Sequence, residues 1–91
     1  NQSGETPLHI ACNIGNYNLM ECLIKQGADI NKRNNNGETP LFIACKMGYE
    51  DLIKYLIERG AEINISNRDD EIPLHIACSR KNKNIIKYLI K

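Results

Sequence analysis

The sequence predicts an all-α fold made of a two-helix unit that occurs three times along the chain. The segments 6–12, 39–45 and 72–78 read TPLHIAC, TPLFIAC and IPLHIAC, so they recur every 33 residues. The segment QGADIN at 26–31 returns with the same spacing as RGAEIN at 59–64. Between these segments, apolar residues recur about every 3.6 residues, as on one face of a helix. A period of this length is typical of solenoids, in which each unit buries its apolar face against its neighbours.

The first helix of each unit has recognisable start and stop signals. Thr6 and Thr39 are suited to cap a helix N-terminus, because the hydroxyl oxygen can accept a hydrogen bond from a free backbone N–H. A proline follows each capping position, where the missing N–H costs nothing. Gly15 and Gly48 fit the end of this helix, where a positive φ is common. The first helices should therefore begin at Pro7, Pro40 and Pro73.

A second helix follows in each unit, and Gly27 and Gly60 are placed to end it in the first two units. Its apolar residues lie at helical spacing. They are Leu19, Met20, Leu23 and Ile24 in the first unit, Leu52, Ile53, Leu56 and Ile57 in the second, and Ile85, Leu89 and Ile90 in the third.

A loop with a tight-turn signal separates successive units. The pair Asn36-Gly37 is typical of a hairpin or of a projecting loop. The third unit departs from this pattern, because Asp70 replaces the glycine and Ile72 replaces the capping threonine. We therefore expect its first helix to begin less cleanly, with Asp69, Asp70 or Glu71 partly replacing the cap.

The period, the TPLH-like helix starts, the GAD-I-N segment and the NNNG turn resemble the ankyrin repeat over essentially the whole chain. The resemblance implies an ankyrin-repeat solenoid of stacked helix-turn-helix pairs, with hairpin-like projecting loops and a surface that binds other proteins. The units would span approximately residues 1–33, 34–66 and 67–91 of a single domain. Since neither end looks like a cap, we expect an excerpt from a longer array or multidomain protein.

Composition and charge exclude several classes of partner. The chain has 91 residues, of which 42% are hydrophobic and 25% charged, as in an ordinary folded domain with a modest core. A net charge of +1 indicates no general attraction to nucleic acid or to an anionic membrane. No apolar run approaches the roughly 18 residues of a membrane-spanning helix. We therefore expect a monomer with no nucleic-acid partner and no membrane partner.

Histidine and cysteine lie three positions apart in TPLHIAC, as in the beginning of a zinc site or of a nucleophile pair. The repeat argues against both, since equivalent positions on stacked helices lie about 8–10 Å apart, too far for a disulfide or a shared metal. Phe42 replaces the histidine in the second unit, which indicates a packing position. We expect no catalytic residue, no cofactor and no metal ligand. The thiols expected to be small buried residues are Cys12, Cys45 and Cys78.

Other residues have two interpretations each. Cys22 is expected to be a partly packed thiol, with surface reactivity as the alternative. Free thiols without regular pairing favour the cytoplasm or another reducing compartment, so the sequons Asn1-Gln2-Ser3 and Asn64-Ile65-Ser66 are expected to be chance matches. The ankyrin resemblance implies that His9 and His75 hold hydrogen bonds between neighbouring loops or helix starts. It also implies that Asn31 and Asn64 are candidates for asparaginyl hydroxylation, if the host has that enzyme.

Candidate binding residues lie where the three units differ, at loop tips and on the exposed edge of the first helices, because packing does not fix residue identity there. Ile14 and Met47 are apolar at equivalent positions that should face outward as neighbours, with a polar rim around them. The alternative is that both tuck against the next helix. The candidate set is Ile14, Arg33, Asn35, Asn36, Glu38, Lys46, Met47, Arg68, Asp69, Glu71, Ser79 and Arg80.

Charge is uneven along the chain, because residues 1–31 carry one basic and three acidic residues whereas residues 65–91 carry six basic and three acidic ones. After Glu71 the charged residues are Arg80, Lys81, Lys83, Lys87 and Lys91. A solvated end of the array explains this excess, and an acidic partner is the alternative.

The sequence therefore predicts a protein–protein interaction scaffold without catalysis, which acts by presenting loop tips and a helix face in fixed geometry. A regulatory or targeting segment of a larger enzyme, channel or adaptor is the main alternative. A purely structural spacer is the third.

Overall fold

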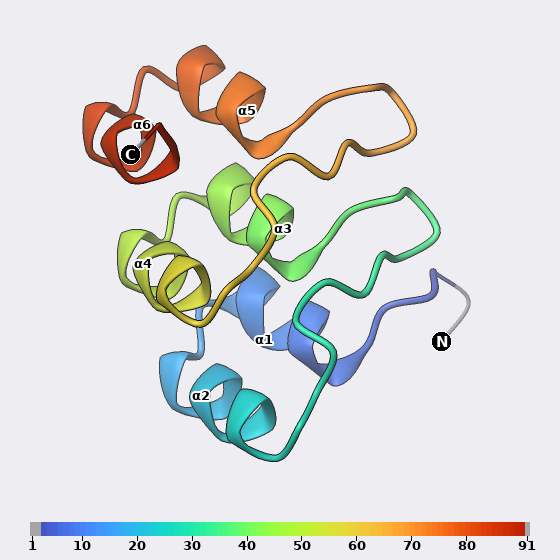
Figure 1. Ribbon diagram of the computed structural model, residues 1–91. Helices are drawn as coiled ribbons and strands as arrows, with labels where there is room; N and C mark the ends of the chain where they lie inside the picture. Colours follow the sequence, from blue (N-terminus) through green and yellow to red (C-terminus); the bar gives the residue numbers. More distant parts are fainter. Residues whose placement is uncertain (1–2, 91) are drawn as a thin grey trace.

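The computed structural model describes residues 3–90, and in this part of the chain six helices form two layers (Figure 1). The first layer contains the first helix of each unit, α1 (Pro7–Ile14), α3 (Pro40–Met47) and α5 (Pro73–Ser79). The second layer contains α2 (Tyr17–Lys25), α4 (Glu50–Glu58) and α6 (Lys83–Leu89). The loops between units project to one side of the stack (Figure 1). The predicted all-α stack of helix pairs is confirmed.

Asn1 and Gln2 of the first sequon and Lys91 of the basic end lie outside the described residues. Within the part described, no helix is long and apolar enough to span a membrane.

The first helices of units one and two are capped as predicted. Thr6 Oγ1 accepts a hydrogen bond from the His9 N–H at 3.3 Å, and Thr39 Oγ1 accepts one from the Phe42 N–H at 3.2 Å. Gly15 ends α1 with a φ of 77°, and a β-carbon there would lie 2.8 Å from a ring carbon of Tyr49. Glycine is therefore required both by the backbone conformation and by the space.

The second helices begin in two ways. Asn16 and Asn82 cap α2 and α6, since their Oδ1 atoms accept hydrogen bonds from N–H groups three residues later at 3.0 and 3.2 Å. The helix α4 has no side-chain cap and instead carries Glu50 and Asp51 in its first turn. Negative charge at this end is favoured because the free N–H groups make it the positive end of the helix.

The third unit begins less cleanly, as expected. The α5 hydrogen bond from the Ile76 N–H to the Ile72 carbonyl is 3.4 Å long, whereas the equivalent bonds of α1 and α3 are both 3.1 Å. The Ile72 carbonyl also accepts a bond of 2.9 Å from the His75 N–H, so α5 begins with a tighter turn. Isoleucine has no side-chain acceptor, and no other side chain caps this helix. The expectation that Asp69, Asp70 or Glu71 would replace the cap is therefore wrong.

The turns of the third unit keep the backbone of the other units without their glycines. Asp70 has a φ of 61° at the position equivalent to Gly37, whose φ is 75°. Lys81 has a φ of 56° at the position equivalent to Gly48, whose φ is 82°. Residues with side chains rarely adopt this conformation, which costs roughly 1–2 kcal/mol when the β-carbon crowds the carbonyl oxygen.

The core lies between the two layers and runs through all three units. Among the apolar residues of the second helices, Leu52, Leu56 and Ile85 are completely or almost completely buried. Leu19, the equivalent of Leu52, is 38% exposed, because no helix of the described residues covers the outer side of α2. Ile90 is also exposed, at the other end of the stack.

Candidate functional site

Each projecting loop is organised by one asparagine. The Asn34 carbonyl accepts a hydrogen bond from the Gly37 N–H, and Asn34 Oδ1 accepts from the N–H groups of Asn36 and Glu38, all at 2.9 Å. This confirms the tight turn predicted at Asn36-Gly37. Asn67 makes the same set of hydrogen bonds in the next loop, with Asp70 in the place of Gly37. Sequence reasoning missed both asparagines, although their 33-residue spacing was a usable signal.

Two arginines join neighbouring loops. The Arg33 guanidinium donates to the Ser66 carbonyl at 3.0 Å, and the Arg68 guanidinium donates in the opposite direction, to the Asn35 carbonyl, also at 3.0 Å. The Arg68 N–H adds a bond of 2.9 Å to the Asn36 carbonyl. We call these contacts the arginine braces. Arg33 and Arg68 were predicted as partner-binding residues, and their guanidinium groups hold the loop surface together.

His9 connects the first helix to the next loop, as the sequence analysis expected. Its Nδ1 atom accepts a hydrogen bond from the Thr6 N–H at 3.0 Å, so its Nε2 atom carries the proton and donates to the Glu38 carbonyl at 2.9 Å. The His75 ring repeats only the first contact, accepting from the Ile72 N–H at 3.1 Å, and it is exposed.

Glu38 does not lie at an exposed loop tip. Its side chain is buried, and Glu38 Oε2 lies 3.1 Å from Lys46 Nζ while Oε1 accepts from the Asn34 side chain at 3.2 Å. Glu71 is half-buried and accepts a similar bond from Asn67 at 3.1 Å. The expected exposure of Glu38 is therefore wrong, because the carboxylate closes the loop from inside.

Ile14 and Met47 are exposed to 59% and 40%, so the outward orientation that the sequence predicts is confirmed and the alternative of tucking inward is not. They occupy equivalent positions at the ends of α1 and α3, which pack side by side. Arg80 occupies the third equivalent position, and its Nη2 atom lies 3.7 Å from where a β-carbon on Gly48 would be. The exposed members of the candidate set are Ile14, Arg33, Asn35, Asn36, Lys46, Met47, Arg68, Asp69, Ser79 and Arg80.

The four cysteines are free thiols and fall into two classes. Burial raises the pKa of both Cys12 and Cys45 to about 12, so these thiols stay protonated and unreactive at neutral pH. Cys78 was expected to be buried but is exposed, because no helix of the described residues covers the outer side of α5. Cys22 is exposed rather than partly packed. Among the described residues, no group of three or more potential ligands could hold a metal ion.

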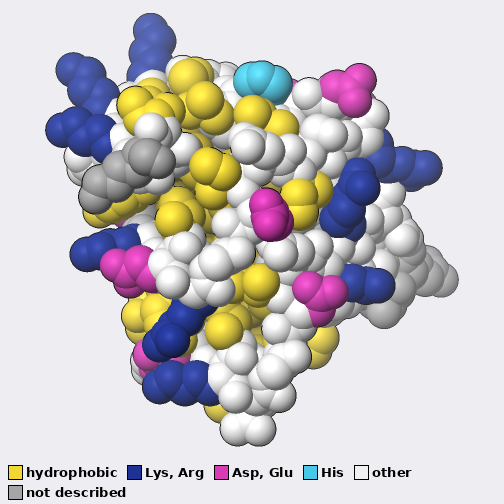
Figure 2. Space-filling model, in the orientation of Figure 1, with side chains coloured by type: hydrophobic (Ala, Val, Ile, Leu, Met, Phe, Trp, Pro, Cys, Tyr) yellow, Lys and Arg dark blue, Asp and Glu magenta, His cyan; other side chains and the backbone are white. Residues whose placement is uncertain are grey.

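Basic side chains gather at the end of the molecule that carries α6, where Figure 2 shows dark-blue groups at the upper left. The described members of this group are exposed, and none forms an ion pair with another described residue. They are Arg80, Lys81, Lys83 and Lys87.

The stacked helix pairs and the hydrogen-bonded loops define a repeat protein that presents a surface rather than a reaction centre. A sequence model described as ankyrin repeats in three copies matches residues 1–67, and one described as an ankyrin repeat matches residues 69–91. The chain therefore belongs to the ankyrin repeat family. Repeats of this family are generally protein–protein interaction modules and are typically not catalytic. A search among curated proteins finds no match to this chain.

Proposed function

We propose that this chain is a non-catalytic scaffold that binds a partner protein through the ends of its first helices and the adjoining loop tips. The central part, which we call the helix-end surface, consists of Ile14, Lys46, Met47, Ser79 and Arg80. The observation that supports it most is the exposure of two large apolar residues at equivalent positions of adjacent helices. An apolar centre inside a polar rim is the arrangement that commonly provides binding energy in protein interfaces.

The loops support this function by being ordered before a partner arrives. The arginine braces and the Asn34 and Asn67 turns fix the loop backbone through hydrogen bonds at 2.8–3.2 Å. Binding to a fixed surface avoids the loss of conformational freedom that ordering a loop would require. The scaffold thus acts by presentation, and Asn36 and Asp69 at the exposed turns are the residues that the loops offer to a partner.

A capture experiment tests this proposal. The tagged chain is incubated with lysate of its host, and captured proteins are quantified by mass spectrometry for the native sequence and for the double variant Ile14→Glu, Met47→Glu. We expect the specific partners to be lost, because each carboxylate would be desolvated in the apolar centre of the interface.

The matched control is Ile90→Glu, which places the same charge on an exposed apolar residue at the end of α6. This variant should retain the partners. Unchanged capture by the double variant would contradict the helix-end surface as the binding site. If the native chain captures nothing specific, the structural spacer is the better function.

We further infer a reducing compartment such as the cytoplasm. All four cysteines are free, and two of them, Cys22 and Cys78, are exposed to solvent. Exposed thiols are prone to oxidation and persist as thiols where the surroundings are reducing. We also propose that residues 1–91 form one monomeric domain with units at about 1–33, 34–66 and 67–91.

A further inference from the structure

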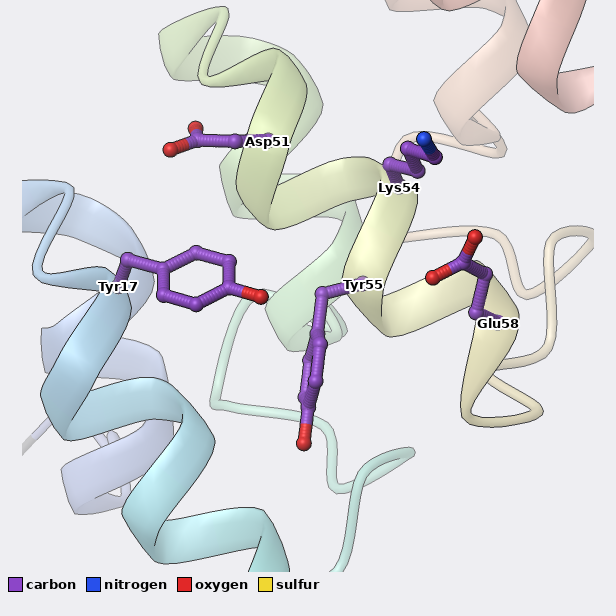
Figure 3. Close-up of a pocket in the computed structure, with 5 residues that line it drawn as sticks. All are labelled: Tyr17, Asp51, Lys54, Tyr55 and Glu58. Carbon is purple, nitrogen blue, oxygen red and sulfur yellow. The ribbon is translucent and has the colours of Figure 1, made fainter.

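A pocket lies between two helices of the second layer, and none of its lining residues belongs to the helix-end surface. It has a volume of about 350 Å³ and is lined by Tyr17 of α2 and by Asp51, Lys54, Tyr55 and Glu58 of α4 (Figure 3). Family membership and the proposed function assign no role to these residues. We call this site the tyrosine pocket.

Two tyrosine rings form the aromatic wall of the tyrosine pocket. Their centroids are 5.6 Å apart and their planes meet at 70°, so the rings pack edge to face. Figure 3 shows the hydroxyl of Tyr17 directed toward the ring of Tyr55. Tyr55 is only 7% exposed, which holds its ring in one place. The pocket therefore offers a preformed aromatic surface.

Two of the three charged residues that line the pocket are acidic. Asp51 and Glu58 lie seven residues apart, which puts them on the same side of α4 two turns from each other. Neither carboxylate forms an ion pair with a described residue, and Lys54 is the one basic residue in the lining. Figure 3 shows the amine of Lys54 pointing away from the two rings. The lining therefore carries a net charge of −1, from two acidic residues and one basic residue.

Partial burial raises the pKa of the Tyr17 hydroxyl, and the nearby carboxylates of Glu21, Asp51 and Glu58, together with the Tyr55 hydroxyl, raise it further. Each of these carboxylates disfavours the charged phenolate, as it would disfavour any anion placed there. The same field favours a cation.

The ring of Tyr55 already contacts one guanidinium group within the chain. The Arg59 Cζ atom lies 5.0 Å from the centroid of this ring, within the range of a cation–π interaction. Arg59 is not among the residues that line the pocket, so its side chain does not occupy it.

We propose that the tyrosine pocket binds the guanidinium group of an arginine side chain presented by a partner protein. A guanidinium is planar and weakly hydrated, so it can lie against a tyrosine ring while its N–H groups donate to a carboxylate. The ammonium group of lysine is a compact, strongly hydrated charge and fits this combination less well. Because the pocket lies on the second-helix layer, this inference goes beyond the proposed function and does not depend on it.

The experiment titrates the 91-residue chain with the acetylated and amidated peptide Gly-Arg-Gly, and follows the aromatic NMR signals of its tyrosines. We expect the Tyr17 and Tyr55 signals to shift and saturate, while those of Tyr49, near α1, stay in place. The citrulline peptide, which has nearly the same shape without the charge, should bind about tenfold more weakly, and the lysine peptide should also bind more weakly than the arginine peptide. Equal affinity for the citrulline or the lysine peptide would overturn the proposal.

A charge-removing variant locates the site. The double variant Asp51→Asn, Glu58→Gln keeps the side-chain shapes and should weaken binding of the arginine peptide about tenfold, because both acceptors lose their charge. The Asn side chain retains the oxygen that accepts from the Leu52 N–H, so α4 should keep its start.

The matched control is Asp29→Asn, Glu62→Gln, which removes the same total charge from exposed residues outside the pocket. Binding by this control should match the native chain. Equal losses in both double variants would show general charge attraction and would overturn the site, and thermal melting of each variant shows that the fold is intact.

Discussion

Lys81 and Asp70 have backbone conformations that glycine has in the equivalent positions of the other units. Both residues are strained, because a positive φ is unfavourable for a residue that has a β-carbon. The strain of Lys81 lies in the turn between α5 and α6, where it reduces the stability of the third unit without any lost contact. Because this strain is confined to one residue, a single substitution can relieve it, and the change in the free energy of unfolding can be measured.

Replacing Lys81 by glycine should stabilise the chain by about 1 kcal/mol, since glycine adopts a φ of 56° without crowding, although its freer unfolded chain offsets part of the gain. The same change at Lys87, inside α6, should destabilise by about 1 kcal/mol because glycine is a poor helix former. Urea unfolding of the two variants checks the opposite signs. If both variants lose stability, Lys81 is not strained.

The buried thiols make stability depend on alkaline pH. Burial raises the pKa of Cys12 and Cys45 from 9.0 to about 12, so in this range the unfolded chain loses thiol protons that the folded chain keeps. Stability from these groups is therefore fully present below pH 9 and falls as pH rises toward 12.

The expected slope is about 1.4 kcal/mol per pH unit for each buried thiol. The double variant Cys12→Ala, Cys45→Ala should lose this slope, whereas Cys22→Ala, Cys78→Ala, at exposed positions, should keep it. Urea unfolding between pH 8.5 and 10.5 tests this, and parallel pH curves for all three proteins would refute it.

At the scale of elements, single side chains couple a helix to the loop of the next unit. His9 does so from the start of α1, by accepting a hydrogen bond from the Thr6 backbone and donating one to the Glu38 carbonyl. Phe42 fills the equivalent place in α3 by packing alone and is almost completely buried. The same position of the repeat is thus filled by a hydrogen-bonding residue in the first unit and by an apolar residue in the second.

Replacing the histidine by phenylalanine should show how much the hydrogen bonds of His9 contribute to stability. In His9→Phe, the buried Glu38 carbonyl loses a partner, which should reduce the free energy of unfolding by about 2 kcal/mol. In His75→Phe the loss should be smaller, because this ring is exposed and water can replace its bond to Ile72. Thermal and urea unfolding compare the two. Equal losses would mean that the contact of His9 with Glu38 adds nothing.

Most elements could be predicted because their signals are local. A capping threonine, a proline and a terminal glycine act within one turn of a helix, so the bounds of α1 and α3 follow from the sequence. The positions of Glu38 and Arg33 could not be predicted in this way. A charged loop residue looks exposed in sequence, and only the folded loops bring Glu38 to Lys46 and Arg33 to Ser66.

For the whole molecule, equivalent residues need not have equivalent surroundings. The 33-residue period relates Leu19 to Leu52 and Cys78 to Cys45, yet the first of each pair is exposed and the second buried. An inner unit is covered by a neighbour on both sides, whereas an outer unit is covered on one side only. Equating residues by the period therefore overestimates burial in the outer units. The tyrosine pocket could not be predicted either, because Tyr17 and Tyr55 are not equivalent positions and meet only when α2 packs beside α4.

The different exposure of Leu19 and Leu52 allows the contribution of stacking to the free energy of unfolding to be measured. Leu52→Ala should cost about 3 kcal/mol, because the residue is 1% exposed and its truncation leaves a cavity. Leu19→Ala should cost only about 1 kcal/mol, since this side chain is 38% exposed. Urea unfolding gives both values. Equal costs would indicate that another surface covers Leu19 in solution.

The arginine braces have a mechanical consequence. They run in opposite directions between the loop before α3 and the loop before α5, Arg33 toward Ser66 and Arg68 toward Asn35, and so join these two loops twice. Tension applied along the stack would load these two contacts together with the helix layers, and separating the units requires both to break. In a single-molecule pulling trace, removing both braces should lower the force at which the third unit peels away.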